Sequence, residues 1–268
     1  MAHLAPVMAA SAVAIAAMML ALWVVSLSRR DASIVDVFWG PGFAMVAWIG
    51  LAIGDGAPSR QWLAAVLTSV WALRLGGYLA WRNWGRGEDP RYVAMRQKHG
   101  ARFGRVSLYT VFGLQGLIMW VVSFPIQQAQ AVPEPMGLSW VEGAGVFLWA
   151  AGLGFESLGD WQLARFRADP ANRGHLMERG LWSWTRHPNY FGDALVWWGL
   201  FLVALPTRGG AWTLVSPALM TFMLVRVSGV ALLERDLRKS KPGYADYIAR
   251  TNAFLPWPPR GRRGGAAD

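Results

Sequence analysis

The N-terminal stretch constrains the fold more than any other part of this sequence. Residues 4–28 contain no Asp, Glu, Lys or Arg. An α-helix rises 1.5 Å per residue, so about 20 apolar residues cross the hydrocarbon core of a bilayer. A cleaved signal peptide is the alternative, but its apolar part is roughly 7–15 residues long and follows Lys or Arg, whereas only His3 precedes this run. We therefore expect a first transmembrane helix.

Six further apolar segments follow, each closed by Gly, Pro or charged residues. Hydrophobic residues make up 54% of the chain and charged residues 16%, which is unlike a soluble domain. The sequence predicts an all-α fold, a polytopic bundle of seven transmembrane helices, as one domain over residues 1–259 with a disordered tail at 260–268. The six later spans are expected at residues 34–53, 62–81, 107–129, 142–163, 188–206 and 210–233.

The distribution of Lys and Arg predicts the orientation of the bundle. Of the 26 basic residues, 22 fall in the connections on one face together with the C-terminal tail. Cytoplasmic loops carry such an excess. We expect the N-terminus outside and the C-terminus in the cytoplasm, in a bacterial inner membrane. The net charge of +10 is then explained by topology, and we expect no nucleic-acid partner.

Several kinds of catalytic site are excluded or disfavoured by missing motifs. The absence of Cys excludes disulfides, thiolate zinc sites and cysteine nucleophiles. No phosphate-binding GxxxxGK[ST] motif occurs, and the pair Gly152 and Gly154 lies inside a predicted span, so a soluble dinucleotide-binding fold is excluded. The four His residues show no metal-ligand spacing, and we expect no catalytic metal. No nucleophile elbow supports a hydrolase.

Ionisable residues at membrane depth indicate where a site lies. Each costs about 2.5–3.5 kcal/mol or more if it faces lipid, so an inward orientation is expected, either for function or for structural ion pairing between helices. They are Asp36, Arg74, Glu156, Asp160, Asp193, Arg226 and Glu234.

Helical spacing groups these residues into stripes, because residues four apart share a face. Tyr78 lies between Arg74 and Arg82 in one stripe. Asn189 and Asp193 form another. A third stripe contains Glu156, Asp160 and, if the helix continues, Arg167.

The connection over residues 164–187 is strongly basic. Its Arg167 and Arg186 are expected to be exposed loop arginines. Pro188 suits the first position of a helix, whose free amide groups and positive dipole end favour an anion such as phosphate. A solvated cytoplasmic loop is the alternative. The cations of this loop are Arg165, Arg167, Arg173, His175, Arg179, Arg186 and His187.

Four motifs together resemble a known family. They lie at residues 31–40 (DASIVDVFWG), 73–78 (LRLGGY), 186–193 (RHPNYFGD) and 244–256 (YADYIARTNAFLP). The chain is similar over most of its length to the bacterial DUF1295 branch of steroid 5-alpha-reductase-like membrane proteins. The RHPxY element alone also resembles isoprenylcysteine carboxyl methyltransferases and sterol reductases, whereas the VDxxWG element favours the reductase-like branch.

The resemblance implies that residues 131–259 hold NADPH on the cytoplasmic side. Residues 1–130 would shape a pocket for a lipophilic enone such as a 3-oxo-Δ4 steroid, with Asp36 and Tyr78 as catalytic residues. Trp39, Arg74 and Arg82 would line that pocket. The cofactor-binding residues implied in this way are Asp160, Arg165, Arg167, His175, Arg186, His187, Asn189, Tyr190, Asp193, Glu234, Arg235, Tyr244 and Tyr247.

The chemistry of enone reduction fits the two catalytic candidates. Negative charge develops on the carbonyl oxygen, and a buried phenol such as Tyr78 can donate a hydrogen bond to it. A carboxyl group such as Asp36, kept protonated by burial, could relay a proton. The alternatives are a membrane methyltransferase using S-adenosylmethionine and a transporter without chemistry.

Overall fold

The computed structural model describes residues 3–260 except 228–229, 231–233, 235–236 and 238–240. The predicted disordered tail, at 260–268, lies outside the described residues apart from Arg260. The chain divides into two compact units, Met1–Val146 with Leu200–Ser216 (unit 1) and Phe147–Gly199 with Pro217–Asp268 (unit 2). Each unit is considered by itself.

The described part of the chain is helical, with one isolated bridge between Thr185 and Asn252. The helices with numbered α labels are α1 (Leu4–Arg29), α2 (Ile34–Val37), α3 (Trp39–Ile53), α4 (Pro58–Asn83), α5 (Pro90–His99), α6 (Phe103–Ser107), α7 (Leu114–Val122), α8 (Phe124–Ala131), α9 (Trp140–Ala168), α10 (Leu181–Trp184), α11 (Pro188–Ala204), α12 (Val215–Phe222) and α14 (Tyr244–Arg250). Shorter 3₁₀ or π segments are η1 (Gly100–Arg102), η2 (Leu108–Gly113), η3 (Pro170–Asn172), η4 (Gly210–Leu214) and η5 (Met223–Val227).

Every segment predicted to span the membrane contains helix. Four helical stretches of the described chain are long and apolar enough to cross a bilayer. The helix α3 has 15 residues and α11 has 17, which is short for a full crossing. The helix α9 has 29 residues but is more polar. The qualifying stretches are Leu4–Arg29, Pro58–Asn83, Pro90–Val122 and Gly210–Val227.

Two of the predicted spans are interrupted where proline falls inside them. Pro41 and Pro125 have no amide hydrogen to donate, and the ring of a proline clashes with the carbonyl four residues before it. The helix accordingly breaks at Phe38, between α2 and α3, and at Ser123, between α7 and α8. Asp36 therefore lies on a one-turn helix ahead of α3 rather than inside a long span.

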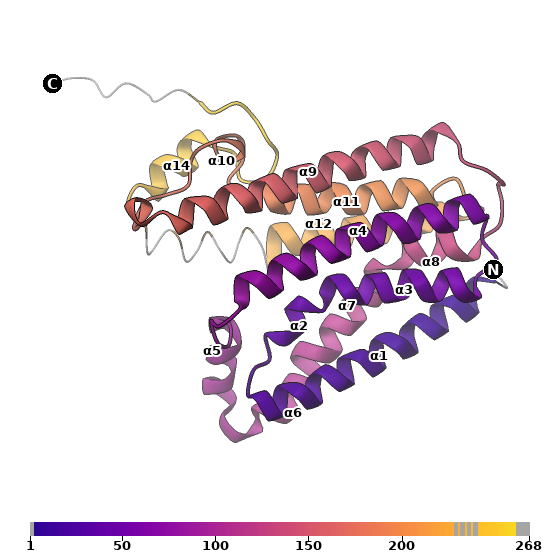
Figure 1. The fold of residues 1–268 in the computed structure, drawn as a ribbon, viewed down its shortest axis with the longest axis horizontal. Helices are drawn as coiled ribbons and strands as arrows, with labels where there is room; N and C mark the ends of the chain where they lie inside the picture. Colours follow the sequence, from indigo (N-terminus) through magenta and orange to yellow (C-terminus); the bar gives the residue numbers. More distant parts are fainter. Residues whose placement is uncertain (1–2, 228–229, 231–233, 235–236, 238–240, 261–268) are drawn as a thin grey trace. The chain divides into compact units, whose positions relative to one another are not determined.

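Unit 1 is built around α3, with α1 and α4 running alongside it (Figure 1). One face of α1 is buried at intervals of three or four residues, which is the pattern of a helix packed on one side. The short helix α8 is buried along its whole length despite three glutamines, and their amide groups hydrogen-bond within the unit. The buried α1 residues are Val7, Ser11, Ile15, Met19, Leu22 and Ser26.

Sequence reasoning did not identify the buried ion pair of unit 1. Arg60, counted as a loop cation, is fully buried at the start of α4, and its Nη2 lies 3.1 Å from Oε1 of Glu142. Its guanidinium also donates to the carbonyl oxygens of Pro135 and Gly137. This pair ties the 132–139 connection to α4.

In unit 2, glycines allow α9 and α11 to approach closely. A Cβ added at Gly192 would lie 2.5 Å from the backbone nitrogen of Glu156 and from the carbonyl oxygen of Gly152. A Cβ at Gly152 would meet the Gly192 carbonyl oxygen at the same distance. Small residues at such a crossing let helix backbones pack at short range in a membrane. The same crossing sets the distance between polar groups on the two helices.

We expect Gly192→Ala to destabilise unit 2. The added methyl group meets backbone atoms that cannot move aside, and overpacking of this kind costs about 1–3 kcal/mol. Thermal unfolding in detergent should show a midpoint lowered by several degrees. Gly154→Ala is the matched control, because a Cβ there has nothing within 4 Å. Equal midpoints for the two variants would contradict the close crossing.

Candidate functional site

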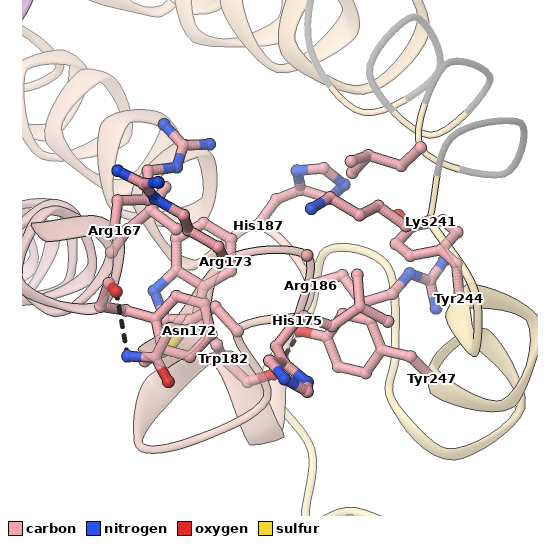
Figure 2. A pocket seen from close by; sticks show the side chains of 16 residues that line it. Arg167, Asn172, Arg173, His175, Trp182, Arg186, His187, Lys241, Tyr244 and Tyr247 are labelled. Atoms are coloured by element: carbon pink, nitrogen blue, oxygen red, sulfur yellow. Dashed lines mark hydrogen bonds between the residues drawn. The ribbon is translucent and has the colours of Figure 1, made fainter. Parts of the chain in front are cut away.

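A cavity of about 290 Å³ lies in unit 2 at the end of α9. Figure 2 shows Arg167 and Arg173 on one side of it and Lys241, Tyr244 and Tyr247 on the other. Its wall combines cations with aromatic rings, and none of the described residues that line it is Asp or Glu. The remaining lining residues are Leu163, Phe166, Asn172, Gly174, His175, Leu176, Met177, Trp182, Arg186, His187 and Leu237.

A second cavity of about 780 Å³ adjoins the first. The two share Phe166 and the segment 172–176 as lining residues. Arg179 and Glu178 also line the second cavity. Glu178 is paired with Arg250, whose Nη2 lies 2.8 Å from Oε2. Together the two cavities offer the volume of a large ligand site, since such sites are typically 300–1,000 Å³.

The C-terminal segment forms one wall of the first cavity because it is tied to the start of α11. The backbone nitrogen of Arg186 donates to the carbonyl oxygen of Asn252, and the hydroxyl of Thr185 donates to Phe254. The hydroxyl of Tyr247 donates to the carbonyl oxygen of Trp182 at 2.5 Å. Burial, the main cause, raises the pKa of Tyr247. These bonds hold α14 and its tyrosines against α10.

Arg186 is buried, which corrects the expectation that it is an exposed loop arginine. Only 7% of its side chain is exposed, and its Nε and Nη2 lie 2.8 and 2.7 Å from Oε1 of Glu234. Its Nη1 donates to the carbonyl oxygen of Thr251. Nε2 of His187 lies 3.3 Å from the same Oε1 of Glu234. Arg186 therefore serves first as the counterion of Glu234.

The structure brings together Asp160 and Asn189, two of the residues predicted to bind the cofactor. The side-chain nitrogen of Asn189 donates to Oδ1 of Asp160 at 3.0 Å, across the glycine crossing of α9 and α11. The ring of Tyr190 stacks on His187 with centroids 5.4 Å apart. Asp160, Asn189, Tyr190 and Asp193 do not line either of the two cavities described above. Tyr190 packs on the cavity residue His187, and the bond between Asp160 and Asn189 holds the start of α11 on α9.

The other predicted cofactor residues are placed as follows. His175 lines both cavities. Arg167, Tyr244 and Tyr247 line the first. Arg165 is exposed, lies over the ring of Trp161 at 5.5 Å, and lines neither cavity. Arg235 lies outside the described residues. Cavity residues that sequence reasoning did not assign to the cofactor are Asn172, Arg173, Trp182 and Lys241.

In unit 1, Asp36 is the centre of a polar cluster. Its Oδ1 accepts from the hydroxyl of Tyr92 and its Oδ2 from Nη2 of Arg91, both at 2.8 Å. Gln115 donates to the Tyr92 hydroxyl at 3.0 Å and accepts from the indole of Trp39. The predicted residues Asp36 and Trp39 are thus joined by residues that sequence reasoning missed. The start of α5 at Asp89 and Pro90, a capping aspartate before a proline, was the available signal.

The stripe predicted around Tyr78 is confirmed. The guanidinium carbons of Arg74 and Arg82 lie 5.5 and 5.8 Å from the centroid of the Tyr78 ring. Both distances are within the range of a cation–π contact. Tyr78 is half-buried on α4. The two arginines therefore lie beside the Tyr78 ring on the same stripe of α4.

An apolar cavity of about 420 Å³ also lies in unit 1. It is formed by α1, η2 and α7, and its wall is almost wholly apolar, with residues such as Met19, Phe112 and Trp120. The predicted substrate-pocket residues Trp39, Arg74 and Arg82 do not line it. Its chemistry suits an acyl chain or another lipophilic group.

Comparison with known proteins identifies the family. The family described as "Protein of unknown function (DUF1295)" matches residues 22–251. The chain belongs to the DUF1295 family. No curated protein and no solved structure matches the sequence. The resemblance seen in the four motifs is thereby confirmed at the level of the family.

We expect Arg186→Ala and Arg167→Ala to differ sharply in stability. Removing Arg186 leaves the carboxylate of Glu234 buried without its counterion, and breaking a buried pair in this way costs about 3–5 kcal/mol. Arg167 is exposed, so its removal should change stability by about 0.5 kcal/mol or less. Thermal unfolding in detergent measures both. A stable Arg186→Ala variant would show that the pair is not structural.

Proposed function

We propose that this DUF1295 protein is an integral-membrane, NADPH-dependent reductase that saturates the C=C bond of an enone such as a 3-oxo-Δ4 steroid. The observation that carries the proposal is the basic and aromatic cavity of unit 2. Planar guanidinium groups suit phosphate oxygens, and aromatic rings suit flat bases. His187 also lines this cavity, and its buried Nδ1 has no hydrogen-bond partner among the residues that the structure describes.

Charge separates this proposal from the methyltransferase alternative. S-adenosylmethionine carries a sulfonium and an ammonium group, which call for carboxylates. Among the described residues that line the first cavity, Arg167, Arg173 and Lys241 are cations and none is acidic. NADPH carries three phosphate groups, and charge-assisted hydrogen bonds from such cations are the strong kind. The cation-rich wall therefore supports a polyanionic dinucleotide.

The protein's share of the chemistry is binding, orientation and electrostatics. NADPH would supply the hydride. Arg167, Arg173 and Lys241 would hold phosphates, and Trp182 and Tyr247 would pack on the bases. In unit 1, the candidate donor to the substrate oxygen is Tyr78, whose ring lies near Arg74 and Arg82. The Tyr92 hydroxyl donates its only proton to Asp36 and so would position that carboxyl group.

The finer topology belongs to the same proposal. We propose seven spans, with the shorter α3 and α11 completed by their flanking residues, the N-terminus outside and the C-terminus cytoplasmic in a bacterial inner membrane. The excess of basic residues on one face supports this orientation. The cations of the unit 2 cavity then face the compartment that contains NADPH.

Removing one cation from the cavity should weaken nucleotide binding. A charge-assisted phosphate contact contributes about 1.5–3 kcal/mol, which is roughly a ten- to hundredfold change in affinity. We expect this loss of NADPH affinity, with normal folding, for Arg167→Ala and for Arg173→Ala in purified protein. Arg102→Ala, an exposed arginine of unit 1, is the matched control. Unchanged affinity in both cavity variants would assign these arginines to topology alone.

Removing the catalytic phenol should lower kcat rather than the affinity for the substrate. Its hydrogen bond strengthens as the substrate oxygen gains charge, so removing the donor costs about a hundred- to thousandfold in kcat. We expect this for Tyr78→Phe in NADPH-dependent saturation of a 3-oxo-Δ4 steroid, scored by product mass. Tyr109→Phe, an exposed tyrosine, is the control.

Two results of this assay would revise the proposal. A larger loss of kcat in Tyr92→Phe than in Tyr78→Phe would assign the reaction to the Asp36 cluster rather than to the Tyr78 hydroxyl. Methyl transfer from S-adenosylmethionine by a parent protein that reduces no enone would replace the reductase with the methyltransferase.

A further inference from the structure

The imidazole of His187 is buried in the wall of the first cavity with one nitrogen unused. Its side chain is 1% exposed. Nε2 lies 3.3 Å from Oε1 of Glu234, while Nδ1 has no hydrogen-bond partner among the described residues. Buried polar atoms in folded proteins are usually hydrogen-bonded, and an unpaired one needs an explanation. Because His187 lines the cavity, a ligand can supply the missing partner.

The surroundings of His187 determine what kind of partner fits. Glu234 accepts from two nitrogens of Arg186, which favours its ionised form. An ionised carboxylate only accepts hydrogen bonds, so Nε2 of His187 must donate to it. In the neutral imidazole the other nitrogen then carries a lone pair. The unpartnered Nδ1 is then the acceptor of a side chain that lines the cavity.

An acceptor at this position selects against some ligand groups and for others. Phosphate oxygens at neutral pH are themselves acceptors, so Nδ1 does not suit them. Two aromatic side chains, Trp182 and Tyr247, line the same cavity as His187. Such surfaces pack on a planar base. A planar base offers a hydrogen-bond donor through an exocyclic amino group.

We propose that Nδ1 of His187 accepts a hydrogen bond from an exocyclic amino group on a base of the bound nucleotide, and that Glu234 with Arg186 is a positioning pair that keeps the imidazole in the accepting tautomer. The inference rests on the proposed function and deepens it. Base recognition belongs to His187, whereas phosphate binding belongs to Arg167 and Arg173.

Two nucleotide analogues test the donor. One carries hypoxanthine in place of adenine and lacks the adenine amino group; the other carries 3-acetylpyridine in place of nicotinamide and lacks the carboxamide amino group. A hydrogen bond of about 1.4 kcal/mol corresponds to a tenfold change in affinity. We expect the parent protein to bind NADPH about tenfold more tightly than one of the two analogues.

Substitutions at His187 then separate an acceptor from a merely structural residue. His187→Gln keeps an amide donor near Glu234 but has no atom in place of Nδ1, so NADPH affinity should fall to that of the discriminated analogue, whose own affinity should not change. His187→Asn places amide atoms near the Nδ1 position and should restore part of the discrimination. His99→Asn, in α5 of unit 1, is the matched control.

The possible results are distinguishable. If the parent protein binds NADPH and both analogues equally tightly, the role of His187 is overturned. The same holds if His187→Gln still binds NADPH more tightly than the analogue. Either result leaves the proposed function standing. No NADPH binding by the parent overturns the proposed function and the nucleotide as ligand.

Nitrogen-15 NMR of the imidazoles tests the positioning pair without any nucleotide. The signal of His187 is assigned by its loss in His187→Gln. We expect a proton on Nε2 and none on Nδ1 in the parent protein at neutral pH, and a mixture of tautomers in Glu234→Gln. A protonated Nδ1 in the parent overturns the positioning role.

Discussion

The ion pair of Arg186 and Glu234 is the interaction on which the site of unit 2 depends. It is almost fully enclosed, and the same guanidinium reaches the carbonyl oxygens of Ile248 and Thr251 at the end of α14. One side chain thus joins the start of α11, the segment that carries Glu234, and the C-terminal helix. A buried pair adds little net stability over an apolar substitute, but it tolerates few other geometries. Its contribution here is the position of the cavity walls.

The sequence predicted the helical segments well because their signals are local. Long apolar runs, a proline at the start of α4 and another at the start of α11 mark helices whatever the rest of the chain does. The same proline rule applies to the breaks at Phe38 and Ser123, which a search for uninterrupted apolar runs overlooks. Span counting by hydropathy therefore merges helices that proline separates.

The site was predicted only in part. Contacts between residues of one helix could be predicted from the sequence, whereas contacts between distant segments could not. The Tyr78 stripe follows from helical spacing within α4 and was predicted, whereas the packing of α9 on α11 was not. The partners Tyr92 and Gln115 of the Asp36 cluster come from α5 and α7, far away in the chain. No spacing rule connects residues separated by more than 50 positions. Such contacts depend on tertiary packing, which one sequence does not contain.

The arginines of the 164–187 connection show why a charge count does not assign roles. All contribute equally to the excess of basic residues that predicts orientation. Arg165 lies over the ring of Trp161, and Arg186 forms an ion pair with Glu234. Arg167 and Arg173 line the first cavity. Arg167 and Arg173 combine exposure with a position in the wall of the first cavity, as Arg179 does in the second. The basic loop can thus both orient the protein in the membrane and bind a ligand. All of its arginines add to the basic excess, and those in the cavity wall can also contact a ligand.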